Sequence, residues 1–322
     1  MPRSDASSVL RDLRALADRP AEQVASASAL LAETRELPMV KAAVKILLAD
    51  GQGPDPALAG MVRSRFAWFH DAGTKRDQGG YIRAALLDLL RPLVDRGDEP
   101  WLEQALHTYE FLPAGEVATF IRAGALLALA EIAPESACWH ATRLLVEPAP
   151  HTQEMTGEPA VTAARLLAAQ GRMLPLYALA AGEGPQIPDV LGEALRLLAE
   201  DLPTPLLAGL LERHLASTND VVLVGAIDLA LGHEHGGAQA GLLADFCKQT
   251  RQREVHRYLA AAAVASRKPE LVTMLEELLA LEQDQVKLDA LVEALTLLPP
   301  EPQRARRLEA ARKRLVGRGS LL

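Results

Sequence analysis

Aromatic residues and cysteines are scarce in this chain, and each shortage excludes a class of protein. Aromatics make up 4% of the 322 residues, although hydrophobic residues make up 49%. The core must therefore be built mainly from Leu, Ala and Val, which are the residues of closely packed helices rather than of sheets. The two cysteines, Cys138 and Cys247, lie far apart inside helical patterns without CxxC spacing. This excludes a disulfide framework, and we expect both to be reduced core residues.

Long apolar runs are also lacking. No stretch of about 20 uninterrupted apolar residues occurs, which is the length that a membrane-spanning helix needs. The N-terminal sequence MPRSDASSVLRDLRALADRP carries charges throughout and has no apolar segment of the kind found in secretion signals. We therefore expect a soluble, cytoplasmic protein without a membrane segment.

Motifs for catalysis and for cofactor binding are missing as well. Neither the phosphate loop GxxxxGK[ST] nor the nucleophile motif GxSxG is present. His233, Glu234 and His235 come nearest to a metal motif, but Gly237 stands where HExxH requires its second histidine. We interpret this stretch as a polar turn between helices. The sequence identifies no catalytic residue and predicts no metal and no cofactor, and it leaves open whether the protein is an enzyme.

What the chain does contain is one helical pattern, clearest in EVATFIRAGALLALAEIA at residues 116–133. Apolar or small residues recur there at helical spacing: Val117, Phe120, Ile121, Gly124, Leu127 and Ala128. They predict a buried stripe that ends before Pro134, with Gly124 at a close contact between helices. A leucine at position 124 is expected to cost several kcal/mol by overpacking. Loss of the Arg122 side chain is expected to cost little.

The same pattern returns along the whole chain. Similar surroundings are found around seven other small residues: Ala43, Ala85, Ala164, Ala194, Gly225, Ala262 and, more weakly, Ala290. Successive centres are separated by about 27 to 42 residues, a range typical of two-helix repeats. Each interval has room for a second helix, so the sequence predicts an array of helical pairs.

In its first helices this array resembles HEAT repeats, which begin with a V-R-x-x-A-x-x-A-L-like pattern. The hydrophobic and basic pair of that pattern is matched by Ile82–Arg83, by Ile121–Arg122 and loosely by Val40–Lys41. Later repeats depart from it, since the basic residue is replaced by Thr162, Gly192, Leu223 and Ala260. The resemblance covers roughly residues 20–316. It implies an all-α, right-handed superhelix, a HEAT-like solenoid of about eight helical pairs.

We expect one continuous domain over residues 1–322. Capping helices would occupy residues 1–36, repeats residues 37–300, and a basic helix and tail residues 301–322. In the stretch from Pro302 onward seven basic residues face one acid, Glu309, so this tail carries +6 and the rest of the chain, whose total is −8, carries −14. The tail either binds an acidic surface or solvates the end of the array. The role of the loop at residues 147–159 and the oligomeric state are left open.

The resemblance implies binding rather than catalysis, since members of this group mostly grip other macromolecules in a concave groove. We therefore expect a non-catalytic scaffold for a protein partner, with the groove lined by the second helices. Aromatic, arginine and histidine side chains of those helices are the candidate contacts: Arg63, Trp68, His70, Trp101, His107, Tyr109 and His140. Trp101, His107 and Tyr109 are assigned to one helix, and each candidate could instead belong to the core.

The alternative is a nucleic-acid enzyme, because DNA alkylation-repair glycosylases are also HEAT-like. Their grooves are basic, whereas this chain has a formal net charge of −8. Binding to the phosphate backbone depends on Lys and Arg, so nucleic acid is disfavoured as a partner.

Overall fold

The computed structural model describes residues 6–50, 55–113, 115–147, 157–183 and 186–319. In these residues the chain forms 19 α-helices, and its only strands are those of one short antiparallel ribbon, β1 (Phe111–Leu112) and β2 (Gly115–Glu116). The prediction of an all-α protein is therefore confirmed. None of the helices in the described parts of the chain combines the length and apolar character needed to cross a membrane.

The chain divides into two compact units, residues 1–166 and 167–322, and the division falls inside α10 (Ala160–Ala169). That the repeats form one continuous domain stays a prediction.

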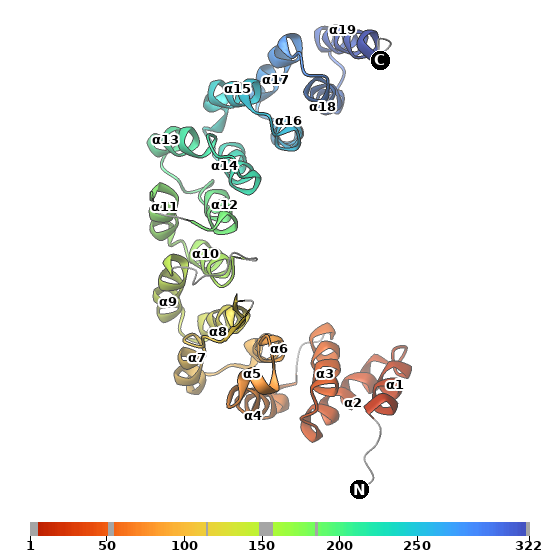
Figure 1. Cartoon of the computed structure of the whole chain (residues 1–322), viewed down its shortest axis with the longest axis vertical. Helices are drawn as coiled ribbons and strands as arrows, with labels where there is room; N and C mark the ends of the chain where they lie inside the picture. Colours follow the sequence, from red (N-terminus) through yellow and green to blue (C-terminus); the bar gives the residue numbers. More distant parts are fainter. Residues whose placement is uncertain (1–5, 51–54, 114, 148–156, 184–185, 320–322) are drawn as a thin grey trace. The chain divides into compact units, whose positions relative to one another are not determined.

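The first unit contains helices α1 to α9 and three 3₁₀ turns. Their bounds are α1 (Ala6–Ala15), α2 (Pro20–Glu33), α3 (Leu37–Ala49), η1 (Pro56–Leu58), α4 (Ala59–His70), α5 (Gly73–Arg76), α6 (Tyr81–Leu90), η2 (Arg91–Leu93), η3 (Arg96–Asp98), α7 (Glu99–Ala105), α8 (Thr119–Ile132) and α9 (Pro134–Val146). The predicted first helices α3, α6 and α8 pack one on the next, and α4, α7 and α9 pack against this row (Figure 1). Helix α6 ends just before Pro92, which cannot continue a helix, and Pro134 begins α9, where a missing N–H is tolerated.

Two boundaries in this unit differ from the sequence prediction. Helix α8 begins at Thr119 because Glu116 is held in the ribbon, and Phe120 is 39% exposed rather than part of a buried stripe. Helix α7 ends at Ala105, so His107 and Tyr109 lie beyond it and not in one helix with Trp101. The close contact at Gly124 is present: a Cβ there would lie 3.2 Å from Cβ of Leu87 in α6.

The second unit continues the alternation with nine helices after α10. Their bounds are α11 (Met173–Ala181), α12 (Pro188–Leu197), α13 (Thr204–His214), α14 (Asp220–Gly232), η4 (Gly236–Gln239), α15 (Ala240–Gln249), α16 (Arg253–Ser266), α17 (Pro269–Leu281), α18 (Gln285–Thr296) and α19 (Pro302–Gly319). Helices α12, α14, α16 and α18 form one row, and α11, α13, α15 and α17 form the other (Figure 1). We call these the first-helix row and the second-helix row.

Glycines let the first-helix row pack very closely. A Cβ on Gly225 of α14 would lie 2.4 Å from the carbonyl oxygen of Gly192 in α12, so the two backbones touch. In the second-helix row, Gly209 and Gly241 have open space instead, and clefts separate α13 from α15 and α15 from α17. Since one row is tight and the other open, the unit curves toward its first helices, and Figure 1 shows the second helices on the outer side of the bend. The prediction that second helices line a concave groove is therefore wrong for this unit.

Substitution of alanine for Gly225 tests this packing. The new methyl group would overlap the backbone of Gly192, so Gly225→Ala is expected to destabilise the protein by about 1–3 kcal/mol. Gly209→Ala is the control, because a Cβ there meets no atom within 4 Å, and it is expected to stabilise α13 by roughly 0.5–1 kcal/mol. Urea unfolding followed by circular dichroism measures both, and equal midpoints for the two variants would contradict the close contact.

Candidate functional site

The seven candidate residues all lie in the first unit, where they fall into three separate groups of contacts. Arg63, Trp101 and His70 belong to the packing of α4 against η3 and α7. Trp68 lies elsewhere on α4, between two arginines. His107 and Tyr109 follow α7 and contact α9, where His140 lies. The structure therefore does not bring the seven together into one site.

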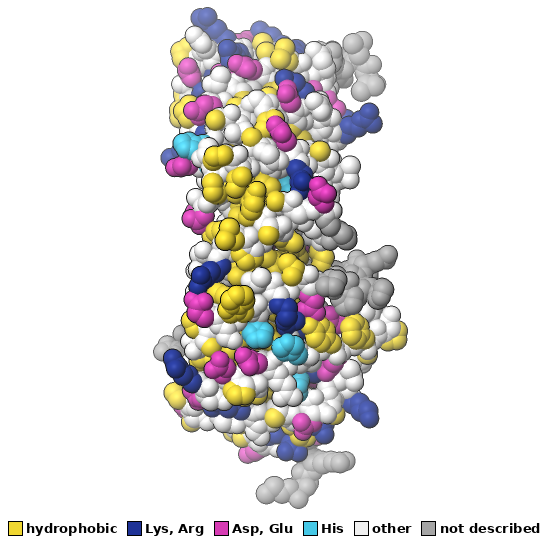
Figure 2. Space-filling view, turned by 90° about the vertical axis from the view of Figure 1, so that its left-hand side faces the viewer, with side chains coloured by type: hydrophobic (Ala, Val, Ile, Leu, Met, Phe, Trp, Pro, Cys, Tyr) yellow, Lys and Arg dark blue, Asp and Glu magenta, His cyan; other side chains and the backbone are white. Residues whose placement is uncertain are grey.

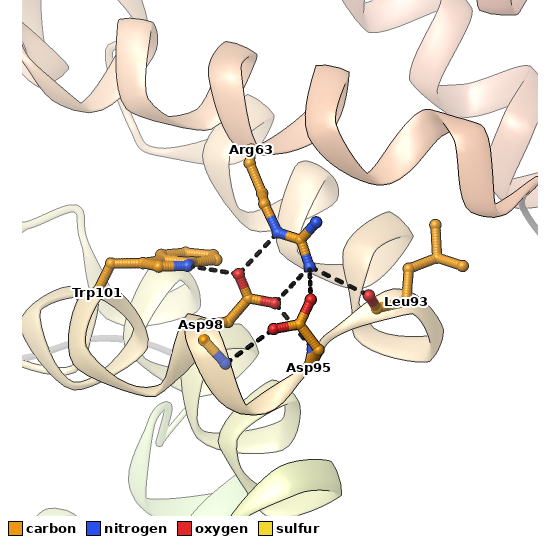
Figure 3. A network of polar contacts seen from close by, with 6 residues as sticks. Arg63, Leu93, Asp95, Asp98 and Trp101 are labelled. Atoms are coloured by element: carbon orange, nitrogen blue, oxygen red, sulfur yellow. Dashed lines mark hydrogen bonds and ion pairs between the residues drawn. The ribbon is translucent and has the colours of Figure 1, made fainter.

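The Arg63 group is a clamp between α4 and the segment before α7 (Figure 3). The Arg63 guanidinium donates to Asp98 Oδ1 and Oδ2 at 2.7 and 2.6 Å, to Asp95 Oδ2 at 3.0 Å and to the Leu93 carbonyl at 3.3 Å. Trp101 Nε1 donates to Asp98 Oδ1 at 2.8 Å. Burial alone would raise the pKa of Asp98, but the hydrogen bonds from Arg63, the Asp95 backbone and Trp101 outweigh it and lower that pKa. Arg63 and Trp101 are thus occupied in holding the fold.

His70 also belongs to the packing. Its ring stacks on Phe66 at 5.3 Å between centroids, and Phe66 in turn meets Trp101 at 5.1 Å. Burial, with the nearby Arg83 charge, lowers the pKa of His70, so the ring is neutral at pH 7. Phe66 and Phe69 are 5% and 0% exposed, so these two aromatics of α4 pack inward.

Trp68 is held between cations. The Arg76 guanidinium lies 4.1 Å from the centroid of the indole ring and the Arg35 guanidinium lies 5.3 Å from it. Arg76 also donates to the Trp68 carbonyl near the end of α4. These cation–π contacts fix the ring and leave it half-buried.

The third group forms a surface that we call the α7–α9 face. Its residues are Glu103, His107, Tyr109, Trp139, His140 and Arg143. Figure 2 views the side of the molecule on which α7 and α9 lie and shows histidine side chains gathered among acidic and hydrophobic ones. The rings of His107 and His140 are 5.7 Å apart, and His140 Nε2 lies 3.7 Å from Glu103 Oε1. Arg143 donates to the Tyr109 hydroxyl at 3.0 Å.

Trp139 is the residue of this face that the sequence analysis missed. Its side chain is 78% exposed on α9, between the buried Cys138 and the half-buried His140. Burial, together with the charge of Arg143, lowers the pKa of His140, so this face carries a neutral imidazole beside the indole at pH 7. Among the residues that the structure describes, no three His, Cys, Asp or Glu side chains are placed to hold a metal ion.

Two buried arginines in the first helices are a second feature that the sequence analysis missed. Arg83 is 0% exposed and donates to Glu110 Oε2 at 2.7 Å and to Asp77 Oδ2 at 3.2 Å. Arg122 is 2% exposed and donates to Glu116 Oε2 and to the Thr108 carbonyl, both at 3.0 Å. The expectation that loss of the Arg122 side chain costs little is therefore corrected.

A row of polar side chains on the second unit's first helices also went unnoticed in the sequence. The Tyr258 hydroxyl of α16 donates to Asp228 of α14, and Arg196 of α12 pairs with Glu193 at 2.6 Å. Burial raises the pKa of Asp228, and burial with the Asp228 contact raises that of Tyr258 to about 12. The three helices place these residues about one repeat apart. The Tyr258 hydrogen bond joins α16 to α14, so we assign it to the packing of successive first helices, whereas the Arg196 pair lies within α12.

The basic C-terminal helix is largely engaged within its own unit. Arg304 and Arg307 of α19 pair with Glu276 of α17 at 2.7 and 2.8 Å. Arg314 donates to the Leu279 carbonyl near the end of α17 at 3.0 Å. These contacts favour the reading in which the positive charge serves the end of the array. Most of the loop at residues 147–159 lies outside the described residues.

Removal of the Arg122 side chain tests the buried pair. Arg122→Ala leaves the Glu116 carboxylate buried without its partner, so we expect a loss of about 3–5 kcal/mol in the free energy of unfolding. Arg91→Ala is the control, because its pair with Glu131 spans 3.7 Å and both side chains are about half exposed. That change is expected to cost at most about 1 kcal/mol. Equal effects of the two substitutions in urea unfolding would contradict the structural role of Arg122.

A buried histidine of the second unit gives a pH test. His256 is 1% exposed, and neither of its ring nitrogens has a hydrogen-bond partner in the described structure. Burial, helped by the Lys287 charge and opposed by Glu282 and Asp284, lowers its pKa from 6.5 to about 4. The unfolded chain therefore binds the proton more tightly. The contribution of His256 to the free energy of unfolding is therefore complete above pH 6.5 and is lost as the pH falls to about 4.

This contribution amounts to about 3 kcal/mol. His256→Phe removes the titrating group, so the variant's stability should fall less than that of the wild type between pH 6.5 and 4. Urea unfolding at several pH values measures the difference. Parallel curves for the two proteins would show that His256 does not titrate with folding.

Comparisons with known proteins identify no relative of this chain. No family model, no curated protein and no solved structure matches it. The function of this chain is therefore inferred from its own residues and contacts.

Proposed function

We propose that this protein is a HEAT-like α-solenoid, a right-handed superhelix that serves as a non-catalytic scaffold for a protein partner. The alternation of first and second helices in both units supports the solenoid. The sequence motifs that match HEAT repeats lie at Arg83 and Arg122, which are buried as structural residues rather than presented to a ligand.

The observation that carries the proposal is the exposure of Trp139. The chain has three tryptophans. Trp68 is in contact with an arginine and Trp101 donates to Asp98, whereas Trp139 is 78% exposed. A large apolar ring in water is unfavourable, and tryptophan is among the residues that dominate binding hot spots.

The surroundings of Trp139 have the composition of a protein interface. Arg143 lies one helical turn after Trp139 on α9 and donates to Tyr109, which is 38% exposed, and His107 and His140 add polar rings to the same face. Tyrosine, tryptophan and arginine are enriched at such interfaces. The net charge of −8 opposes binding to nucleic acid, so the partner is a protein.

A pull-down with the full chain from extract of its native cells tests this function. We expect a specific partner that binds saturably to wild type and at least tenfold more weakly to Trp139→Ala, because the central apolar contact is lost. Leu297→Ala is the matched control, since Leu297 is 77% exposed at a site in the other unit, and it should bind as wild type does.

The same samples are also titrated with duplex DNA at low and moderate salt. Tight, steeply salt-dependent DNA binding without a recovered protein would overturn the scaffold proposal. A partner that is retained equally by both variants would show that the α7–α9 face is not its binding site.

A further inference from the structure

Side chains from later in the chain, mostly Arg and Lys, donate hydrogen bonds to the carbonyl groups at several helix ends. In the second-helix row these donors cap the C-terminal ends of α11, α15 and α17. His214 makes such a contact as a neutral imidazole, because burial lowers its pKa. His214 Nε2 lies 2.8 Å from the Ala180 carbonyl of α11, and Arg213 donates to the Gly182 carbonyl at 3.1 Å. Lys287 Nζ donates to the Cys247 carbonyl of α15 at 2.7 Å, and Arg314 ends α17 in the same way.

The physical reason for these contacts is general. The last four carbonyl groups of an α-helix have no partner within the helix, and the helix dipole makes that end negative. A guanidinium or ammonium group satisfies both needs at once. Positive charge from the following part of the chain therefore caps the C-terminal ends of α11, α15 and α17.

Helix α13 is the exception in this row. The buried residues of α15, Leu243 and Phe246, stand where Leu207 and Leu210 stand in α13. In this register Gln249 and Thr250 replace the capping pair Arg213 and His214. Within the described residues no cationic side chain donates to the end of α13. Gln252 donates to Thr218, which lies beyond that end.

A cleft is present where the missing side chain would lie. It has a volume of about 730 Å³ and runs between the end of α13, helix α15 and the turn after it. Leu215 and Phe246 give it an apolar wall, and Glu212 and Asp245 give it negative charge. Lys248 pairs with Asp245 at 3.0 Å, whereas Glu212 has no ion pair in the described structure. Arg251 also lines the cleft and makes no hydrogen bond or ion pair there.

We propose that this cleft receives an arginine side chain from a segment of a partner protein. The aliphatic stem would pack on Leu215 and Phe246, and the guanidinium would cap the C-terminal end of α13 beside Glu212. The arrangement that Arg213 makes at the end of α11 is the intramolecular counterpart. This inference goes beyond the proposed function, since the α7–α9 face belongs to the other unit and plays no part in it.

Nuclear magnetic resonance with the full chain tests the inference. The probe is a blocked Gly-Arg-Gly peptide, and the comparison peptide carries citrulline, which is neutral and has nearly the same shape. We expect saturable shifts of the backbone amides of residues 215–218 and 245–252 with the arginine peptide. The citrulline peptide should bind at least fivefold more weakly, because it lacks the charge that the helix end and Glu212 attract.

Gln249→Arg gives the chain its own cap at the end of α13, so this variant should bind the arginine peptide at least fivefold more weakly. Gln249→Met should bind the peptide as wild type does. Should Gln249→Arg fail to fold, Glu212→Gln replaces it and is expected to weaken binding through loss of the negative charge. Arg251→Gln is the second control, and it should preserve or strengthen binding. Equal binding of the two peptides, shifts scattered over the surface, unchanged binding by both Gln249→Arg and Glu212→Gln, or loss in Arg251→Gln would overturn the proposal.

Discussion

An array of short helices must satisfy the carbonyl groups at many helix ends, and the solution to this constraint ties successive repeats together. The donor to a helix end often comes from about one repeat later: Arg65 of α4 donates to the Leu31 carbonyl of α2, and Arg143 of α9 donates to Leu106 after α7. Each such bond satisfies a polar group and fixes the spacing between neighbours. Positive charge is therefore part of the packing, although the chain as a whole is acidic.

The two units join their first helices by different means. In the first unit the basic residues of the HEAT-like pattern, Arg83 and Arg122, are buried with carboxylate partners and hold the segments that precede α6 and α8. In the second unit Gly192 stands in place of that basic residue and lies against Gly225. A buried ion pair needs room for two long side chains between the helices. Helices whose backbones touch leave no room for them. Loss of the basic residue in the sequence thus coincides with a gain in close packing.

Periodicity predicted the helices because it reports which residues share a face, and proline and Gly124 marked boundaries and a close contact correctly. It could not show which face is covered. Phe120 fits the apolar spacing but is exposed, and Arg122 breaks it but is buried, because Glu116 and Thr108 supply partners that spacing does not encode. For the same reason the exposure of Trp139 is absent from the sequence pattern.

Departures from the repeat pattern are therefore the places where a scaffold can carry specificity. A residue that every repeat needs for packing cannot be adapted to one partner without loss of stability, whereas an exposed indole or an unfilled helix end is free of that demand. Leaving the last carbonyl groups of α13 without a hydrogen bond from a cationic side chain forgoes at most about 1 kcal/mol of stability, since Arg213 and Arg251 still place positive charge near that end. That sum is small beside the several kcal/mol of a buried ion pair such as that of Arg122. The fold therefore tolerates an open helix end far more readily than it would tolerate a broken pair in its first helices.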